Sequence, residues 1–300
     1  MRKNNFQNKN NEKTNFRVAE KIELMDFLLK KMGGMSRNSV KNLLAHRQVS
    51  VNGKIVTQYN HQLAENDKIT VSNARGNIEL SHPKLRILFE DPYIIVVEKK
   101  HGLLTVSTGK SDETTVFSIL KNYVKKQSPQ NHIYIVHRLD RDTSGVLVFA
   151  KQRETQLALQ ENWHTIVRQR TYFAVVEGFM PKNEDTLISW LTENPKSLKI
   201  HSSRTDNGGQ KSVTHYKSIK SNEKYSLLEI NLETGRKNQI RVHLQEAEHP
   251  IVGDKKYGSE NNPIGRMALH AKILDFFHPV THHPVRFESP VPKEFMKILL

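Results

Sequence analysis

The feature that most constrains the fold is a series of short apolar segments that do not alternate regularly with helices. Several of them alternate apolar and polar residues, which is the pattern of strands with one buried face. The expected strands span residues 85–89, 94–97, 133–136, 146–150, 172–176, 213–219 and 225–232. The expected helices span residues 116–124, 155–163 and 238–247. The pattern therefore predicts an α+β domain with a mostly antiparallel sheet over residues 85–300.

A second, smaller domain is predicted for residues 17–75. Apolar residues recur at helical spacing between residues 24 and 28, and a second amphipathic helix follows Ser36, a good N-cap residue. Asn52-Gly53 between two apolar-rich flanks is the strongest local signal for a β-hairpin. This region therefore predicts two short helices followed by a hairpin.

The segments outside these two domains are polar. Residues 1–16 are rich in asparagine and lysine and carry too little apolar surface to offset the entropy of ordering, so we expect a disordered basic tail. Residues 76–84 contain Gly76 and Pro83 and are expected to form a linker between the two domains.

The chain is strongly basic, with a formal net charge of +15 at pH 7. Such a surface favours phosphate-rich partners, so nucleic acid is the leading partner class. In the smaller domain, Arg37 and Lys41 lie one turn apart on the second helix and Arg47 lies near its end. These three residues are candidate RNA ligands, although the same pattern fits an ordinary solvated helix face.

Composition also excludes several classes of protein. The chain contains no cysteine, so it has neither disulfides nor thiolate nucleophiles. No stretch approaches the roughly 18 apolar residues of a membrane-spanning helix, and the polar N-terminal segment lacks the apolar core of a signal peptide. We therefore expect no membrane partner and a cytoplasmic location.

The strongest candidate for chemistry is the nonapeptide from His137 to Gly145, His-Arg-Leu-Asp-Arg-Asp-Thr-Ser-Gly, which joins two strand-like segments. Asp140 lies beside two arginines in this segment, and a cationic neighbour favours the ionised form of a carboxylate. An ionised carboxylate in a pocket can act as a nucleophile, a general base or a metal ligand.

Several interpretations of this nonapeptide stay open from the residues alone. Asp140 and Asp142 can hold Mg²⁺, but no further carboxylates accompany them. A glycosidase needs a second acid, which nothing in the sequence marks, and Thr143-Ser144-Gly145 lacks the Gly-x-Ser-x-Gly pattern of serine hydrolases. The segment also fits a purely structural turn closed by an arginine-capped aspartate.

A second basic motif surrounds the helix expected to begin near Asn238. Arg241 would point away from the core and reach a carboxylate, but a phosphate-facing or solvent-facing helix start fits the same residues. Tyr172 could stack on a planar ligand, although a lone tyrosine more often belongs to the core. The histidine-rich segment 278–283 could bind zinc, but prolines interrupt any helical ligand spacing.

Taken together, these motifs resemble those of RluA-type RNA pseudouridine synthases preceded by an α-L RNA-binding domain of the kind found in a small-subunit ribosomal protein. The nonapeptide matches the family's catalytic signature without a gap, and Asp140 falls on its catalytic aspartate. Further matches, in the family's order, are Arg170-x-Tyr172, Gly235-Arg236, Gln239-Ile240-Arg241-Val242-His243, Gly253-Asp254, Tyr257-Gly258 and Leu269-His270-Ala271. In the smaller domain, the matching positions are Ser36-Arg37 and Val51-Asn52-Gly53-Lys54.

The resemblance implies that uridine in RNA is isomerised to pseudouridine, by detaching uracil from its ribose and rejoining it through carbon five. The implied catalytic residues are Asp140 as nucleophile or base, Arg241 as its ion-pair partner, and Tyr172 as a stacking platform for uracil. The implied substrate-binding residues are His137, Arg138, which would fill the gap left by the flipped base, and Arg236, which would bind phosphate. No metal or other cofactor is expected, because bond breaking and remaking balance within one nucleotide.

Two positions depart from the family pattern. Lys100 stands where the family usually has proline, and Asn238 stands where histidine is commonest. Neither position carries the chemistry in the family.

The partner implied by the resemblance is RNA. By analogy, the accessory domain favours large-subunit ribosomal RNA over transfer RNA, and we expect a monomer. The alternative from another class is a non-catalytic RNA-binding or ribosome-assembly protein on the same fold.

Overall fold

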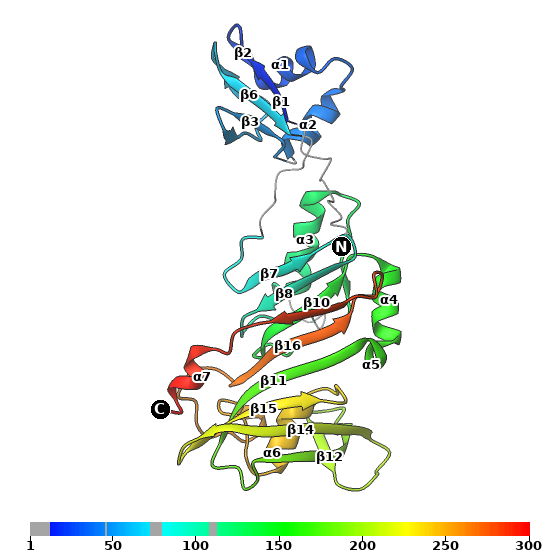
Figure 1. The fold of residues 1–300 in the computed structure, drawn as a ribbon, viewed down its shortest axis with the longest axis vertical. Coiled ribbons are helices and arrows are strands. Elements are labelled where there is room, and N and C mark those ends of the chain that lie inside the picture. The colour runs from blue at the N-terminus through cyan, green and yellow to red at the C-terminus, as the bar shows by residue number, and fades with distance from the viewer. Residues whose placement is uncertain (1–12, 46, 73–79, 108–112) are drawn as a thin grey trace, which may run out of the picture. The chain divides into compact units, whose positions relative to one another are not determined.

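The computed structural model describes residues 13–45, 47–72, 80–107 and 113–300. The chain divides into two compact units, one formed by residues 1–80 and 122–131 and the other by residues 81–121 and 132–300. The first unit contains the predicted small domain, and the second contains the predicted catalytic residues (Figure 1). In the described part of the chain, no helix is long and apolar enough to cross a membrane.

The first unit combines a four-stranded sheet with two helices. Its elements are β1 (Lys13–Arg17), β2 (Ile22–Glu23), α1 (Leu24–Lys31), α2 (Arg37–Ala45), β3 (Val49–Val51), β4 (Lys54–Ile55), β5 (Gln62–Leu63) and β6 (Lys68–Ser72). The sheet has the order β1-β6-β3-β4, while β2 and β5 form a separate pair. The apolar faces of both helices bury Leu28 and Leu44 in one cluster with Ile69 of the sheet, which is the packing expected of amphipathic helices.

The local signals read from the sequence of this unit are confirmed. The N–H of Ser39 donates to Ser36 Oγ at 3.1 Å, so Ser36 caps α2. Asn52 and Gly53 have φ values of 50° and 80°, the conformation that the two-residue turn between β3 and β4 requires.

The prediction of a disordered tail is wrong for residues 13–16. Lys13–Arg17 form β1, which pairs antiparallel with β6 along its whole length. Phe16 packs edge-on against Phe27, with ring centroids 6.2 Å apart. Composition alone missed this strand because main-chain pairing and one partly buried aromatic ring suffice to order a polar segment. Residues 1–12 of the expected tail lie outside the described residues.

The second unit is built on an 11-stranded sheet (Figure 1). Its strands are β7 (Leu85–Glu90), β8 (Ile94–Lys99), β9 (Tyr134–Ile135), β10 (Ser144–Ala150), β11 (Val167–Glu177), β12 (Glu184–Glu193), β13 (Ile200–Ser203), β14 (Gln210–Ser221), β15 (Tyr225–Leu232), β16 (Leu269–Phe277) and β17 (Pro284–Glu288). The order is β13-β12-β14-β15-β11-β16-β10-β8-β7, with β17 beside β16 and β9 beside β10. Only β10 and β16 pair in parallel among the described strands of this sheet. The predicted α+β class with a mostly antiparallel sheet is confirmed.

The remaining helices lie between or after these strands in the sequence, and the first of them runs from the second unit into the first. They are α3 (Val116–Gln127), α4 (Arg153–Glu161), α5 (Trp163–Ile166), α6 (Gln239–Glu246), the 3₁₀ turn η1 (Lys255–Tyr257) and α7 (Lys293–Lys297). Helix α6 packs against β12, β13 and β14, which are the three strands at one edge of the sheet (Figure 1). Every strand and helix predicted in this unit has a counterpart, but β12, β13, β16, β17, α5, η1 and α7 were not predicted.

Candidate active site

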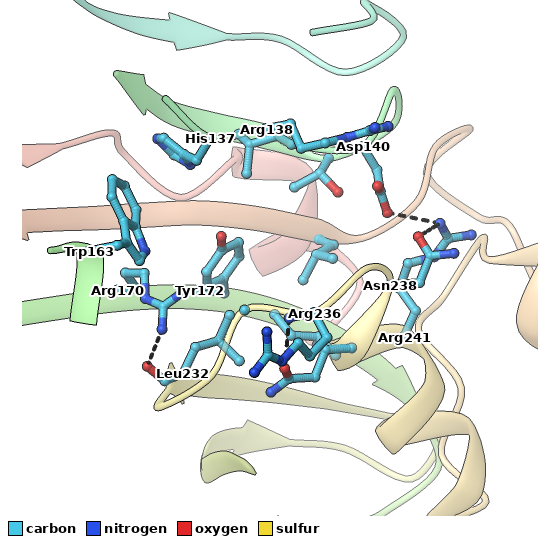
Figure 2. A pocket seen from close by; sticks show the side chains of 16 residues that line it. His137, Arg138, Asp140, Trp163, Arg170, Tyr172, Leu232, Arg236, Asn238 and Arg241 are labelled. Atoms are coloured by element: carbon cyan, nitrogen blue, oxygen red, sulfur yellow. Dashed lines mark hydrogen bonds and ion pairs between the residues drawn. The ribbon is translucent and has the colours of Figure 1, made fainter. Parts of the chain in front are cut away.

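A pocket of about 280 Å³ opens where three segments of the second unit meet. The loop between β9 and β10 forms one wall, β11 contributes Tyr172, and the turn from β15 into α6 forms the opposite wall. Figure 2 shows Asp140 and Arg241 at one side of the pocket, Tyr172 in the middle, and His137 and Trp163 at the other side. The pocket thus gathers the three predicted catalytic residues, which are distant in the sequence.

The loop that carries Asp140 is anchored to the end of β8. The buried Lys99 Nζ donates to the carbonyl oxygens of Leu103 at 2.8 Å and Arg141 at 2.9 Å. Burial lowers the pKa of Lys99 to about 7, although nearby aspartates oppose this shift. Lys99 therefore ties the loop that carries Asp140 to the neighbouring loop through two main-chain contacts.

Gly145 allows the loop to enter β10 close to β16. Its φ of 121° lies outside the range that L side chains normally adopt, and a Cβ atom there would overlap the backbone of Ala271. The two residues are partners in the parallel β10–β16 pairing. The last residue of the nonapeptide is thus dictated by the close approach of two central strands.

Arg241 connects Asp140 to a second carboxylate. Its Nη1 donates to Asp140 Oδ2 at 3.0 Å, while its Nε and Nη2 donate to the two carboxylate oxygens of Asp254 at 2.6 and 2.8 Å. Burial alone disfavours the charged guanidinium, but the hydrogen bonds and charges of the two aspartates outweigh it and raise the pKa of Arg241. The Asp254 side chain is 1% exposed and that of Asp140 is 28% exposed. Oδ1 of Asp140 has no hydrogen-bond partner among the described residues, so it is accessible to a ligand.

Asn238 reinforces the position of Arg241. Its Oδ1 accepts a hydrogen bond from Arg241 Nη1 at 3.2 Å, and its Nδ2 donates to the hydroxyl of Tyr257 at 2.9 Å. The guanidinium carbon of Arg241 lies 4.8 Å from the centroid of the Tyr257 ring. Asn238 precedes α6 with a φ of 55°, a conformation that asparagine tolerates better than most residues. The residue that replaces the family's commonest histidine therefore contacts Arg241 directly.

Tyr172 is aimed into the pocket by an irregularity in the sheet. The register between β11 and β16 shifts so that Thr171 pairs with Ile273 while Tyr172 pairs with Ala271. A bulge of this kind re-aims a side chain next to a site. Burial is the main cause that raises the pKa of Tyr172, so the phenol is neutral at physiological pH.

His137 lines the pocket, but its ring is already engaged. Its Nε2 accepts a hydrogen bond from the N–H of Val148 at 3.2 Å, and its ring packs against Trp163 at a centroid distance of 4.8 Å. Burial, helped by the charge of Arg170, lowers the pKa of His137 to about 3, so the imidazole is neutral. These contacts make His137 part of the pocket wall, and its contact with substrate stays a prediction.

Arg138 and Arg236 supply cations at the pocket. Both are exposed, and neither guanidinium has a hydrogen bond or an ion pair with a described residue. The turn that carries Arg236 is fixed by its own N–H, which donates at 3.0 Å to the Oε1 of the buried Gln239. Both guanidiniums are therefore placed on ordered backbone with their N–H donors open to an anion.

Three residues of the site were not predicted. Arg170 lines the pocket and donates through Nη2 to the carbonyl of Glu233 at 2.9 Å, and the Arg170-x-Tyr172 spacing on one strand could have identified it. Asp254 could have been identified from the Gly253-Asp254 match. Trp163 left no sequence signal beyond its place at the end of an expected helix.

The predicted RNA ligands of the smaller domain lie in the first unit, on or just after α2. Arg37 Nη2 is 3.9 Å from Asp26 Oδ1, and Lys41 Nζ is 5.5 Å from the ring centroid of Tyr59. Arg47 follows the helix with a φ of 56°. All three side chains are exposed, and their contact with RNA stays a prediction.

The structure also bears on the alternatives left open by the nonapeptide. The described residues contain no cluster of three or more histidines or carboxylates suited to a metal ion. Ser144 is buried, where its Oγ lies 2.8 Å from Nδ1 of His270 and accepts a hydrogen bond from Arg266 at 2.7 Å. This serine belongs to an internal polar network and does not line the pocket.

Comparison with known proteins adds independent findings. Residues 93–246 match the family model described as RNA pseudouridylate synthase, and residues 24–69 match the S4 domain. The ribosomal large subunit pseudouridine synthase D of Xylella fastidiosa is 35% identical over 230 residues, which cover 72% of this chain and 68% of that protein. An uncharacterized RNA pseudouridine synthase of Bacillus subtilis, YhcT, is 31% identical over 88% of each chain.

A solved structure shares the fold. The human protein RNA pseudouridylate synthase domain containing 4 matches with a TM-score of 0.57 and 23% identity, covering 70% of this chain and 90% of that chain. The family model spans the segment from β8 to α6, which includes Asp140, Tyr172 and Arg241 of the pocket. The chain therefore belongs to the RluA-type RNA pseudouridylate synthase family and carries an S4 domain near its N-terminus.

Proposed function

We propose that this RNA pseudouridine synthase modifies uridine in large-subunit ribosomal RNA and that Asp140 is the group that reacts with the nucleoside. The observation that carries the proposal is the ion pair between Asp140 and Arg241 at 3.0 Å, at the edge of a pocket that also holds Tyr172. One oxygen of Asp140 is held by the guanidinium while the other is open to the pocket. This is the arrangement that a carboxylate needs to act as a nucleophile or a general base.

The reaction is balanced within one nucleotide. The bond between ribose C1′ and uracil N1 breaks, a bond between C1′ and C5 forms, a proton leaves C5, and a proton is added at N1. Asp140 would attack the nucleoside or remove a proton, while Arg241 fixes the position of the carboxylate relative to it. The neutral phenol of Tyr172 provides a flat surface for the uracil ring.

The target base has to leave its stack to enter this pocket. Unstacking removes contacts that a side chain can replace. Arg138 is exposed, has no partner among the described residues, and lies two residues from Asp140, so it is suited to fill the gap. Arg236, on the opposite wall, is suited to contact a phosphate.

Two findings favour ribosomal RNA as the substrate. The relative from Xylella fastidiosa is named for the large ribosomal subunit, and this chain shares 35% identity with it over 230 residues, which cover 72% of this chain. The S4 domain and the net charge of +15 provide a second, phosphate-binding surface suited to a large structured RNA.

The test is to map pseudouridines in total RNA from cells with and without the gene. The proposal predicts that one or more uridines of large-subunit ribosomal RNA lose their modification in the deletion strain and regain it when the gene is restored. Loss of pseudouridine only from transfer RNA would refute ribosomal RNA as the substrate. A pseudouridine map that the deletion leaves unchanged would refute pseudouridine formation as the function in those cells. If the deletion strain grows poorly and the Asp140→Asn gene restores its growth without restoring any pseudouridine, the activity that growth requires would be RNA binding or ribosome assembly.

A further inference from the structure

A second pocket, of about 400 Å³, adjoins the active site within the same unit. Its walls are the end of β12, the start of β13, the glycine turn before β14, and the turn that leads into α6. Arg236 lines both this pocket and the active-site pocket. The turn before α6 is therefore a wall shared by the two.

The lining of the second pocket combines apolar and polar groups. Leu191 and Ile200 lie at its base, where they pack with Val242 and Tyr257 in a small buried cluster. Lys237 forms an ion pair with Glu193 at the rim. The pocket therefore offers a small apolar floor, because Leu191 and Ile200 are each 5% exposed, beside the Arg236 guanidinium, which is free to bind an anion.

Gln210 adds an amide to this lining. It is exposed at the first position of β14, and its side chain has no hydrogen bond to a described residue. An amide offers one acceptor and two donor hydrogens, which can contact either a base edge or a phosphate.

The glycine turn keeps this pocket open. Gly208 has a φ of 79°, and a Cβ atom on Gly209 would lie 2.9 Å from Thr192 Cγ2 and 3.0 Å from the carbonyl oxygen of Leu191. The turn therefore runs directly against β12 and presents backbone to the pocket, which leaves its volume unfilled.

We propose that the second pocket binds the nucleotide that adjoins the target uridine in the RNA chain. A uridine flipped into the active-site pocket stays bonded through its phosphates to both neighbours, so one adjoining nucleotide has to pass close to the rim of that pocket. Arg236 lies on the wall common to both pockets and can bind the connecting phosphate. The neighbouring base then packs over Leu191 and Ile200, within reach of the Gln210 amide. This inference rests on the proposed function, because it assumes a uridine beside Asp140.

The first test introduces a negative charge in the second pocket without changing its shape. Gln210→Glu replaces the amide by a carboxylate of the same size, and the matched control is Gln245→Glu, which makes the same change at an exposed position of α6 outside both pockets. The probe is total RNA from cells that lack the gene, with both binding and pseudouridine formation measured at fixed salt. Gln210→Glu is expected to weaken binding and lower kcat/KM about tenfold, and Gln245→Glu less than twofold. Equal effects of the two variants would overturn the proposal.

The second test identifies the nucleotide that occupies the pocket. Hairpin RNAs that contain the mapped uridine are made with an abasic ribose on its 5′ or its 3′ side. On one side, the abasic change is expected to weaken binding to the wild-type protein about tenfold. It should have less than a twofold further effect on binding to the Gln210→Glu protein, because the introduced carboxylate already keeps that nucleotide out of the pocket. Additive losses on both sides would overturn the subsite. If the wild-type protein forms no pseudouridine, the proposed function fails. The RNA-binding affinities of Gln210→Glu and Gln245→Glu would still decide whether RNA enters this pocket.

Discussion

The guanidinium of Arg241 binds two carboxylates that differ in exposure, with a two-point contact to the buried Asp254 and a single contact at 3.0 Å to Asp140. The two-point contact fixes the plane of the guanidinium, because two parallel N–H donors have to meet two oxygens. The two N–H groups of Nη1 are then directed at Asp140 and Asn238. Asp254, which does not line the pocket, is therefore a positioning residue for the candidate nucleophile.

Replacing Asp254 by Asn should misplace Arg241 without removing it. The amide offers one acceptor oxygen, and its NH₂ group faces a guanidinium N–H that it cannot pair with. We expect kcat for pseudouridine formation to fall about 10- to 100-fold, with KM changed less than about threefold. The matched control is Asp185→Asn, a partly exposed carboxylate outside the pocket that pairs with Lys182, and this change should leave kcat unchanged. A folded Asp254→Asn protein with normal kcat would contradict this positioning role.

Gly145→Ala should destabilise the second unit. The added Cβ would overlap the backbone of Ala271 and would also require a positive φ, so we expect the free energy of unfolding to fall by about 2–5 kcal/mol. Gly258→Ala is the matched control, because Gly258 has a φ of 92° but nothing within 4 Å of its Cβ position. That variant should lose only about 1 kcal/mol. Urea unfolding measures both values, and equal losses would show that the close approach of β10 and β16 adds nothing.

Stability should decrease as the pH falls below neutrality. Burial is the main cause that lowers the pKa of His243 and of His270 to about 4 each, whereas an unfolded histidine titrates near pH 6.5. Between these values the unfolded chain binds more protons than the folded protein. The free energy of unfolding is therefore highest above about pH 6.5 and falls toward pH 4, by at most about 1.4 kcal/mol per pH unit for each histidine.

Urea midpoints at pH 7, 6 and 5 measure this dependence. In the His243→Gln protein, the free energy of unfolding should fall less steeply with decreasing pH, by the contribution of one histidine. This expectation holds whatever the change does to stability at pH 7. His164→Gln, at an exposed position of α5, should leave the slope unchanged. A decrease of the same steepness in the His243→Gln protein would show that this histidine is not held neutral.

Binding to RNA should weaken steeply as salt is added, because a chain with a net charge of +15 displaces cations from phosphates. Replacing Arg37 and Lys41 together by Ala should reduce the slope of log affinity against log salt by about 1–2. The control replaces Lys293 and Lys297 of α7 by Ala, which removes the same number of positive charges. It should change the slope by less than half as much. A slope unaffected by the change on α2 would exclude that helix from the RNA contact.

Much of the site could be predicted because the residues that identify it lie close together in the sequence. The nonapeptide holds Asp140, Arg138 and the glycine that the sheet requires within nine consecutive residues, so a single window identifies the candidate catalytic loop. The Asn52-Gly53 turn was equally local, since the two residues determine their own backbone conformation.

Other features depended on contacts between distant segments. Strand β16 lies at the centre of the sheet, yet Lys272 and Asp275 interrupt its apolar residues, and its partners come from three separate parts of the chain. The contact of Asp254 with Arg241 exists only because the segment after α6 folds back over the helix. Strand β1 is ordered by β6, about 50 residues later. Periodicity within a window cannot report such pairings.

The most direct test of the central claim compares Asp140→Asn with Asp142→Asn on RNA from cells that lack the gene. Both changes remove one negative charge from the same loop, but Asp142 is exposed and does not line the pocket. The measurement is the amount of pseudouridine formed at the uridine mapped in the deletion strain. We predict no detectable pseudouridine with Asp140→Asn and at least about half the normal rate with Asp142→Asn. Pseudouridine formed by Asp140→Asn at the normal rate would contradict the account.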